Sequence, residues 1–259
     1  VDLPGFGQSA GLSAQETESN TVLEGCLDAL LAVLPQRCTL MGWSLGGMLA
    51  TQLAGRYPER VISLITLASN PCFVQKADWS SAMSEQTFEE FCQLFQQQPA
   101  VCLKRFYGLQ CRGDSDERNL LKALKASVGD SLENCFGNSF ETSLGNSLEK
   151  SLSENPQVSW LQGLHLLAEI DNRQILKSLE VPGLHVYGET DQLVPVPSAK
   201  AVAAFNPLQQ VAVLAQRAHL PHLSSPEELV QRILDFQETL KHSDEHVDHG
   251  YHTHPSNSY

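Results

Sequence analysis

The sequence has no apolar run long enough to cross a membrane, and its first residues do not form a basic segment followed by an apolar one. We therefore expect no membrane helix, no signal peptide and a cytoplasmic location. Basic residues are also scarce, because 17 Lys and Arg stand against 30 Asp and Glu, which gives a formal net charge of −13. This balance argues against nucleic acid as the main partner.

Cysteine is present without the spacing of a metal site or of a disulfide framework. The seven cysteines are odd in number and scattered, and no two of them form a C-x-x-C pair. This usage is typical of small buried side chains in a reducing compartment. The sequence therefore predicts neither disulfides nor structural zinc, and we expect no metal and no cofactor.

Strand and helix patterns alternate at both ends of the chain. Strand patterns occupy residues 38–41, 60–68, 181–188 and 210–214, and helix patterns occupy residues 21–34, 45–56, 198–205 and 225–240. This alternation indicates an α/β fold with a mostly parallel sheet and helices on both faces. A chain of 259 residues that is 42% apolar can build one sizeable core and still have room for a subdomain.

The middle of the chain has a different pattern, because residues 85–128 show helical spacing of apolar side chains and no strand candidate. We therefore divide the chain into four parts. They are the first half of the core at 1–72, a helical cap at 73–170, the second half of the core at 171–240, and a tail at 241–259.

Two segments are low in complexity. A four-residue repeat runs through residues 131–154, and we expect a tandem-duplicated surface insertion there, with a dedicated binding element as the alternative. The tail contains five histidines, at positions 242, 246, 249, 252 and 254. We expect this tail to be disordered, with chelation of a divalent metal as the alternative.

The most informative motif is Gly42-Trp43-Ser44-Leu45-Gly46, which has the G-x-S-x-G pattern of a nucleophile elbow. In an elbow, a strand turns sharply into a helix and the serine hydroxyl is exposed at the bend. The strand pattern before Ser44 and the helix pattern after it fit this context. We expect Gly42 and Gly46 to lie where a Cβ atom would collide with neighbouring backbone. The motif predicts that Ser44 is a nucleophile.

A serine nucleophile needs a histidine that accepts its proton. No histidine precedes residue 165, and five of the nine lie in the tail. Of the remaining four, His165 falls in the helical cap and His185 inside a strand pattern. His219 follows the last strand after a short loop, where α/β sheets present their chemistry. We therefore predict His219 as the base, with His222 as the alternative.

The base in turn needs a carboxylate, which lies between serine and histidine in the chain order that accompanies this motif. Asp191 follows the strand that ends at Gly188, and the turn at Gly188 favours it over the nearby Glu189. Asp171 has the position of a turn or cap carboxylate before a short helix. The predicted set is Ser44, Asp191 and His219.

These motifs together resemble a known family. Val1-Asp2-Leu3-Pro4-Gly5-Phe6-Gly7-Gln8-Ser9 at the start, Gly42-Trp43-Ser44-Leu45-Gly46-Gly47 at the elbow, Ala68-Ser69-Asn70-Pro71-Cys72-Phe73 after the second strand and Ala218-His219 near the end are similar to the α/β-hydrolases. Within that fold they resemble the pimeloyl-acyl-carrier-protein methyl ester carboxylesterases of biotin synthesis. The resemblance runs from residue 1 to about residue 240, apart from the repeat.

The resemblance implies hydrolysis of the methyl ester of a pimeloyl chain on acyl carrier protein, which yields methanol and a free carboxylate. It implies that the backbone N–H of Leu45 is an oxyanion donor. Separately from the resemblance, we expect a monomer without nucleic-acid or membrane partners. The implied substrate contacts are Trp43, Leu45, Phe106, Tyr107, Gly108, Leu109 and Gln110. The implied contacts to the carrier protein are Arg105, Arg118 and Lys122.

The charge pattern of the cap fits an acidic carrier. Residues 104–125 contain six basic and three acidic side chains, a local charge of +3 within a chain of net charge −13. Such a surface would steer an acidic protein toward the cap. The alternative is an ordinary solvated helix face.

Members of the resembled family carry a first strand, a His-Gly-Trp type loop with the second oxyanion donor, and a helix before the Asp-Leu-Pro-Gly segment. This sequence begins at that segment, so we expect an N-terminally incomplete fold. Two other functions stay open at this point. One is a general short-chain carboxylesterase or acyl hydrolase that uses the same three residues, and the other is a truncated, non-catalytic fragment.

Overall fold

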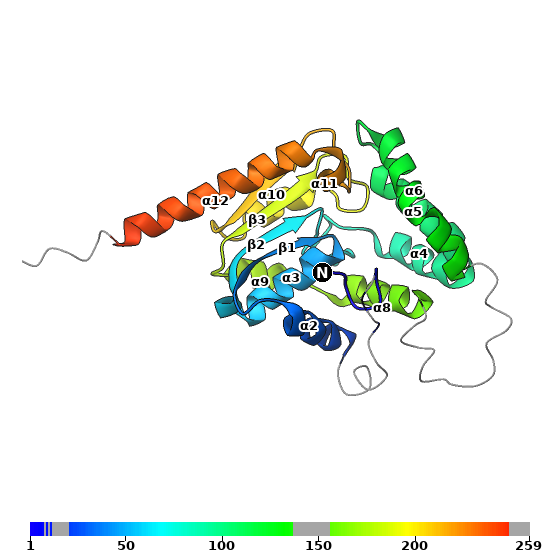
Figure 1. Cartoon of the computed structure of the whole chain (residues 1–259), viewed down its shortest axis with the longest axis horizontal. Helices are drawn as coiled ribbons and strands as arrows, with labels where there is room; N and C mark the ends of the chain where they lie inside the picture. Colours follow the sequence, from blue (N-terminus) through cyan, green and yellow to red (C-terminus); the bar gives the residue numbers. More distant parts are fainter. Residues whose placement is uncertain (8, 10, 12–20, 137–155, 249–259) are drawn as a thin grey trace, which may run out of the picture.

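The computed structural model describes residues 1–7, 9, 11, 21–136 and 156–248. In these residues the sheet has four parallel strands in the order β1-β2-β3-β4 (Figure 1). The strands are β1 (Cys38–Trp43), β2 (Val61–Leu67), β3 (Gly183–Gly188) and β4 (Gln209–Leu214). Trp43 pairs with Leu67 and Leu67 with Val186, so the carboxyl ends of the strands meet at one edge. The predicted α/β architecture with a parallel sheet is confirmed.

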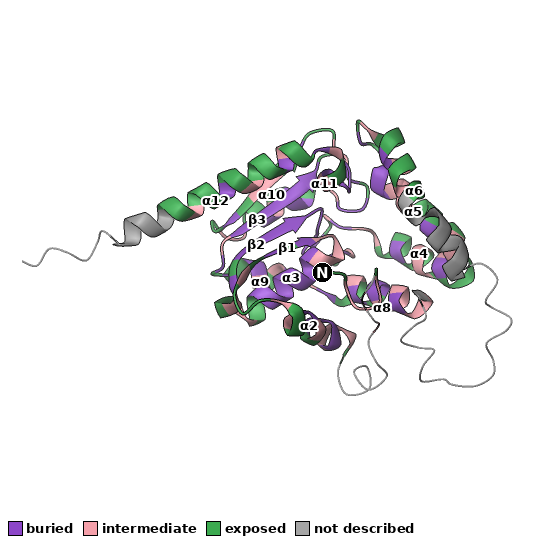
Figure 2. Ribbon diagram, in the orientation of Figure 1, coloured by how far each residue is buried: buried purple, intermediate pink, exposed green. Residues whose placement is uncertain are grey.

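Helices cover both faces of this sheet, and its two central strands, β2 and β3, are largely buried (Figure 2). One core cluster contains Leu64 and Tyr187 together with residues of seven described helices, four of which lie in the predicted core segments. These four are α2 (Val22–Val33), α3 (Leu45–Arg56), α9 (Arg173–Ser178) and α10 (Pro197–Ala203). On the other face, α12 (Pro226–Asp248) packs against Ile65 and Val186. Neighbouring residues of β2 therefore serve opposite faces, as strand geometry requires.

Local signals set the start of α2 and the end of α12. Thr21 caps α2 by accepting a hydrogen bond from the N–H of Glu24 at 3.3 Å. The helix α12 ends at Asp248 instead of Leu240, because no glycine or proline interrupts residues 241–248. The first eight residues of the predicted disordered tail are therefore helical. Residues 249–259 lie outside the described residues, together with three of the five tail histidines.

In its described residues, the segment predicted as the cap contains α4 (Glu85–Gln97), α5 (Pro99–Cys111), α6 (Glu117–Phe136) and α8 (Pro156–Glu169). The first three of these helices stand beside the sheet near the carboxyl ends of its strands (Figure 1). Residues 131–136 of the predicted repeat belong to α6, and residues 137–154 lie outside the described residues. The chain leaves the core and re-enters it at one point. There Cys72 and Asp171 form an isolated antiparallel β-bridge, and the N–H of Asn172 donates a hydrogen bond to the carbonyl of Pro71 at 2.7 Å.

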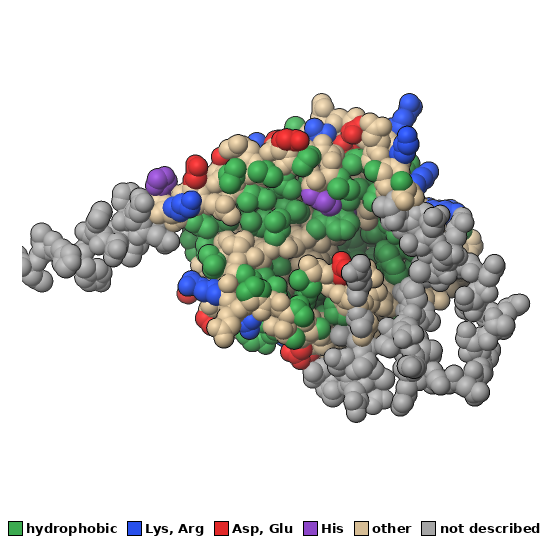
Figure 3. Space-filling model, in the orientation of Figure 1, with side chains coloured by type: hydrophobic (Ala, Val, Ile, Leu, Met, Phe, Trp, Pro, Cys, Tyr) green, Lys and Arg blue, Asp and Glu red, His purple; other side chains and the backbone are tan. Residues whose placement is uncertain are grey.

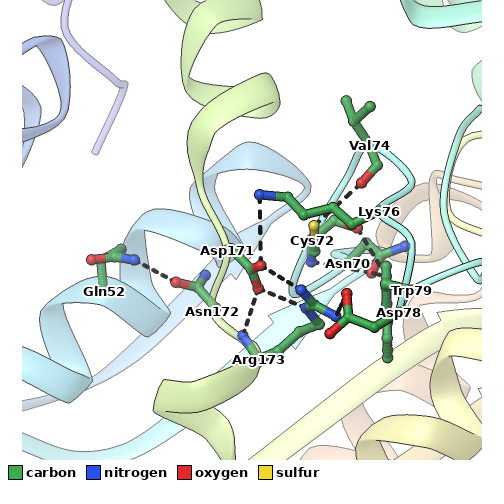
Figure 4. A network of polar contacts seen from close by, with 10 residues as sticks. All are labelled: Gln52, Asn70, Cys72, Val74, Lys76, Asp78, Trp79, Asp171, Asn172 and Arg173. Atoms are coloured by element: carbon green, nitrogen blue, oxygen red, sulfur yellow. Dashed lines mark hydrogen bonds and ion pairs between the residues drawn. The ribbon is translucent and has the colours of Figure 1, made fainter. Parts of the chain in front are cut away.

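A polar network fixes this crossing point (Figure 4). The Arg173 guanidinium donates to Asp171 at 2.7 Å and pairs with Asp78 at 2.8 Å, and Lys76 lies 3.7 Å from Asp171. Burial raises the pKa of Asp171, but the hydrogen bonds from Arg173 outweigh it and hold that pKa below its usual range. Asp171 is therefore an anchor for the loop before α9, as the sequence indicates.

The junction of β1 and α3 is a sharp turn at Ser44, whose φ is +52°. A Cβ at Gly42 would collide with the carbonyl of Gly46, which explains the first glycine. The expectation for Gly46 is wrong, because a Cβ there would meet nothing within 4 Å. The close contact belongs to Gly47, where a Cβ would lie 2.7 Å from the Cβ of Ser69.

In the described sheet β1 pairs only with β2, so its other side is an edge. Met41 on β1 is 57% exposed and Ile62 on β2 is 47% exposed. Apolar side chains also gather on the face of the molecule that Figure 3 shows. Because β1 is this edge strand, Ser44 directly follows an edge strand of the described sheet.

In the part of the chain that the structure describes, no helix is both long and apolar enough to span a membrane.

His185 lies inside the sheet, where the sequence places it, and is 2% exposed. The side-chain nitrogen of Gln209 donates to the Val181 carbonyl, so its Oε1 faces His185 Nε2 at 3.1 Å as an acceptor. His185 Nδ1 then accepts from the Thr66 hydroxyl at 2.8 Å. Burial lowers the pKa of His185 to about 4, although the contact with Gln209 raises it. The folded protein therefore keeps this ring neutral.

We predict that Gly42→Ala and Gly46→Ala differ sharply in stability. A Cβ at Gly42 has to displace backbone, so this variant loses on the order of 3 kcal/mol in the free energy of unfolding. A Cβ at Gly46 enters open space in the first turn of α3, and alanine favours helix by up to about 1 kcal/mol. Urea unfolding measures both, and equal losses would contradict the steric explanation.

We also predict a pH dependence that His185 carries. Between about pH 6.5 and pH 4 an unfolded histidine binds a proton and the folded His185 does not, so the free energy of unfolding falls as the pH falls. The full difference is about 3 kcal/mol. His185→Gln removes this part of the slope of stability against pH. His165→Gln, at an exposed position, is the matched control, and an equal slope change in both variants would contradict the prediction.

Candidate active site

Three side chains meet at the carboxyl edge of the sheet. Ser44 directly follows β1, Asp191 lies in the loop after β3, and His219 lies in the loop after β4. Parallel strands bring these loops to the same edge although the residues are up to 175 positions apart. The sheet topology therefore assembles the three residues that the sequence predicts.

The three side chains form a continuous hydrogen-bonded chain. The Oγ of Ser44 lies 2.9 Å from Nε2 of His219, and Nδ1 of His219 lies 2.7 Å from Oδ2 of Asp191. The side chains of His219 and Asp191 are completely buried, and Ser44 is half-buried. An ionised Asp191 accepts the Nδ1 proton, which leaves the Nε2 lone pair for the Ser44 hydroxyl. This geometry is suited to moving a proton from serine to histidine.

The second oxygen of Asp191 is also occupied. Its Oδ1 accepts the N–H groups of Leu193 at 2.8 Å and Val194 at 3.0 Å, which fixes the plane of the carboxylate. Glu189, the nearby alternative, is exposed and accepts the N–H of Gln216 at 2.8 Å. Asp191 therefore contacts the His219 ring, whereas Glu189 binds the backbone of the loop that carries His219.

Trp43 contacts His219 through both its ring and its N–H. Its Nε1 donates to the carbonyl of His219 at 2.8 Å, and the two ring centroids are 5.5 Å apart. The ring centroid of Trp43 also lies 5.3 Å from that of His222. The structure therefore places His219 at Ser44 Oγ and leaves His222 against the indole. Burial lowers the pKa of His222, and the neighbouring His219 lowers it further.

The backbone N–H of Leu45 opens α3 and has no acceptor within the helix. An acyl group bonded to Ser44 Oγ would place its carbonyl oxygen near this helix end, where the N–H and the helix dipole favour negative charge. Leu45 therefore has the position of an oxyanion donor. The described residues contain no group of three or more His, Cys, Asp or Glu arranged to hold a metal ion.

Aromatic rings of the cap, together with Phe6 of the first core segment, pack beside this helix end. The Trp160 centroid lies 5.5 Å from that of Phe6, 6.0 Å from that of Phe106 and 6.1 Å from that of Phe95. A Cβ at Gly163 would lie 3.4 Å from the Phe6 ring and 3.7 Å from the Leu45 side chain, so this glycine lies between the aromatic group and the elbow. The sequence does not predict this role of Trp160, because a single tryptophan in a helical pattern does not indicate what it faces.

The structure places the predicted substrate segment at the end of α5. Phe106, Tyr107, Gly108 and Leu109 are half-buried, and a Cβ at Gly108 would meet open space. Gln110 is 3% exposed, and its carbonyl accepts the N–H of His219 at 3.1 Å. The last residue of the segment therefore holds the histidine loop in addition to bordering the site.

Basic side chains project from α5, α6 and the turn between them. Lys and Arg gather on this side of the molecule (Figure 3). All six predicted members of the group are exposed: Lys104, Arg105, Arg112, Arg118, Lys122 and Lys125. Of the three acidic residues in the same stretch, Asp114 is buried and does not face solvent. The exposed surface is therefore more basic than the local charge of +3 suggests.

Solved structures share this fold. A bromoperoxidase from Bacillus anthracis matches with a TM-score of 0.70 and 18% identity, over 92% of this chain and 80% of that one. An esterase from Exiguobacterium antarcticum matches with a TM-score of 0.66 and 18% identity, over 91% of this chain and 79% of the other. At these identities the likeness concerns the fold.

Sequence comparisons are more specific. Residues 1–226 match the model of the alpha/beta hydrolase fold family. The biotin biosynthesis bifunctional protein BioHC of Cellvibrio japonicus is 40% identical over 240 residues, which are 93% of this chain and 42% of the relative. The pimeloyl-[acyl-carrier protein] methyl ester esterase of Aeromonas hydrophila is 34% identical over 237 residues, 91% of this chain and 83% of the relative.

The chain thus spans about two fifths of the bifunctional relatives and most of the length of the single-function esterases. The resemblance found in the motifs is confirmed. By its fold, by the family model and by these relatives, the chain belongs to the α/β-hydrolase family and, within it, to the pimeloyl-[acyl-carrier protein] methyl ester esterases.

Proposed function

We propose that this chain is a serine carboxylesterase that hydrolyses the methyl ester of a pimeloyl chain carried on acyl carrier protein. The products are methanol and the carrier-bound chain with a free carboxylate. The observation that carries the proposal is the hydrogen-bonded chain of Ser44, His219 and Asp191 in a member of this esterase family. The names of the relatives support the substrate.

The geometry gives the steps. Nε2 of His219 takes the hydroxyl proton as Ser44 Oγ attacks the ester carbonyl, and the Leu45 N–H donates to the oxyanion that forms. Collapse breaks the bond to the methoxy oxygen, which leaves as methanol with the proton from His219. Water then attacks the acyl-serine, His219 accepts a proton from it, and the free carboxylate leaves as Ser44 recovers its proton. Asp191 stabilises the imidazolium of His219 during both acylation and deacylation.

Two features of the cap support a carrier-bound acyl substrate. The aromatic group of Phe6, Phe106 and Trp160 beside Leu45 offers apolar surface to an alkyl chain. The exposed basic residues of α5 and α6, among them Arg105, Arg118 and Lys122, would attract an acidic carrier in an otherwise acidic chain. Together they favour a long acyl substrate on a protein over a small free ester.

We predict that a fluorophosphonate modifies Ser44 in the full chain and that Ser44→Ala abolishes the modification. Asp191→Asn keeps the side-chain shape but no longer holds the Nδ1 proton on His219, so labelling slows by about 10²- to 10⁴-fold. Mass spectrometry of the labelled peptide gives site and rate. Ser224→Ala, at a half-buried serine on α11 (Pro221–Ser224), is the control. A folded chain whose Ser44 stays unmodified would refute the serine mechanism.

We also predict that the chain hydrolyses carrier-bound methyl pimelate with a higher kcat/KM than free methyl pimelate, and that Arg118→Glu lowers this advantage. Reversal of one charge on the basic surface slows association with an acidic carrier, by roughly 3- to 10-fold at low salt. Arg232→Glu makes the same charge change on α12, at an exposed residue paired with Glu228.

Steady-state rates on both esters measure the effect at low and high ionic strength. A loss that Arg118→Glu and Arg232→Glu share would show a general effect of net charge. Equal kcat/KM for carrier-bound and free esters in the wild type would favour a general carboxylesterase instead.

A further inference from the structure

The loop that carries His219 is held by the cap. The N–H of Ala218 donates to Oδ2 of Asp114 at 2.9 Å, and the N–H of His219 donates to the Gln110 carbonyl at 3.1 Å. In the opposite direction, the N–H of Ser115 donates to the Gln216 carbonyl at 3.0 Å. The backbone of the base residue and of its predecessor is therefore bonded to the end of α5 and the turn before α6.

Asp114 is the side chain at the centre of this contact. It is fully buried, and both of its oxygens accept backbone N–H groups, Oδ2 from Ala218 and Oδ1 from Asp116 at 2.9 Å. The Arg217 guanidinium lies 3.5 Å from Oδ1 and donates to the Ser115 hydroxyl at 2.7 Å. A buried carboxylate with this donor set is fixed in orientation, because any rotation leaves charge without a partner.

The opposite side of the loop is held by the core. The indole N–H of Trp43 donates to the His219 carbonyl, and the N–H of Thr190, beside Asp191, donates to the Arg217 carbonyl at 2.9 Å. The loop thus has fixed partners on the elbow, on the acid loop and on the cap. Two carboxylates are among the partners of this loop, the exposed Glu189 beside Asp191 and the buried Asp114. Asp114 is the one from the cap, a different part of the fold than the three residues of the hydrogen-bonded chain.

We propose that Asp114 is a positioning residue for His219 and makes the competence of the base depend on the seating of the cap. The inference rests on the proposed function, in which His219 takes the proton of Ser44. A shift of the α5–α6 turn pulls on Ala218, and His219 follows as its neighbour in the chain. Because α6 begins at this turn and carries Arg118 and Lys122, a carrier protein bound on α6 acts on the same turn.

Asp114→Asn tests the proposal with little change of volume. Asparagine has one acceptor oxygen where aspartate has two, so either Ala218 or Asp116 loses its partner and faces an N–H group. We expect fluorophosphonate to label the whole population of this variant with a rate constant lowered about tenfold, since small misplacements of a base cost rates of this size. On a free p-nitrophenyl ester, kcat should fall by a similar factor with little change in KM.

Asp116→Asn is the matched control. It lies two residues away in the same turn, and its carboxylate accepts from the Asn119 side chain and makes no contact with residues 216–219 among the described interactions. We expect its labelling rate constant within twofold of the wild type. A merely structural role for Asp114 would lower the fraction of protein that labels and leave the rate constant of that fraction unchanged, and this result would overturn the proposal.

Two other results are possible, a variant that does not fold and a wild-type chain that does not label. If Asp114→Asn does not fold, Arg217→Gln loosens the same contact from the loop side. A labelling rate constant lowered severalfold in that variant supports the proposal, and an unchanged one overturns it. If the wild-type chain itself does not label, the proposed function fails, and this result is distinct from a failure of the role of Asp114.

Discussion

Ser44 is held at a φ of +52°, a backbone conformation that costs a residue with a side chain about 1–3 kcal/mol. The surroundings impose this turn. The N–H of Ser44 donates to the Leu67 carbonyl at 2.9 Å, which continues the β1–β2 ladder to the last residue before α3. Gly42 and Gly47 let the strand, the helix and Ser69 approach without a Cβ between them. The serine hydroxyl faces His219 because the backbone cannot relax from this turn.

The histidine depends on a different kind of support. Its loop has no regular secondary structure, and its position comes from hydrogen bonds to three other segments. The elbow contributes the Trp43 indole, the acid loop contributes Glu189 and Thr190, and the cap contributes Gln110 and Asp114. A loop supported in this way can be as precise as a helix, because the N–H groups of Gln216, Ala218 and His219 and the carbonyl of His219 all have defined partners.

The cap is joined to the core at both ends of its chain and at the active-site edge. The network around Asp171 and Arg173 closes the crossing point, and the Asn172 side chain donates to the Met48 carbonyl in α3. At the far end, Asp114 reaches the base loop. The same helices expose the basic residues and contribute Phe106 to the aromatic group, so substrate contacts and support of the base come from one unit.

The sequence by itself determined the parts of this protein that depend on local pattern. The strand–turn–helix around Ser44 is encoded by residues that are adjacent in the sequence. Few histidines lie outside the tail, so there are few candidates for the base. Sequence order and the turn at Gly188 favour Asp191 as the carboxylate that pairs with the histidine. These predictions needed only periodicity, turn chemistry and the rule that parallel strands present their carboxyl ends together.

Only the tertiary structure decided which residues meet across the chain. Gly47, and not Gly46, needs to lack a Cβ because Ser69 lies against it, and nothing near either glycine encodes that contact. Asp114 in its own segment has the pattern of a turn carboxylate, yet it accepts from Ala218, which is 104 residues away. Local sequence sets the conformation of a segment, whereas a contact between distant segments depends on how the whole chain packs.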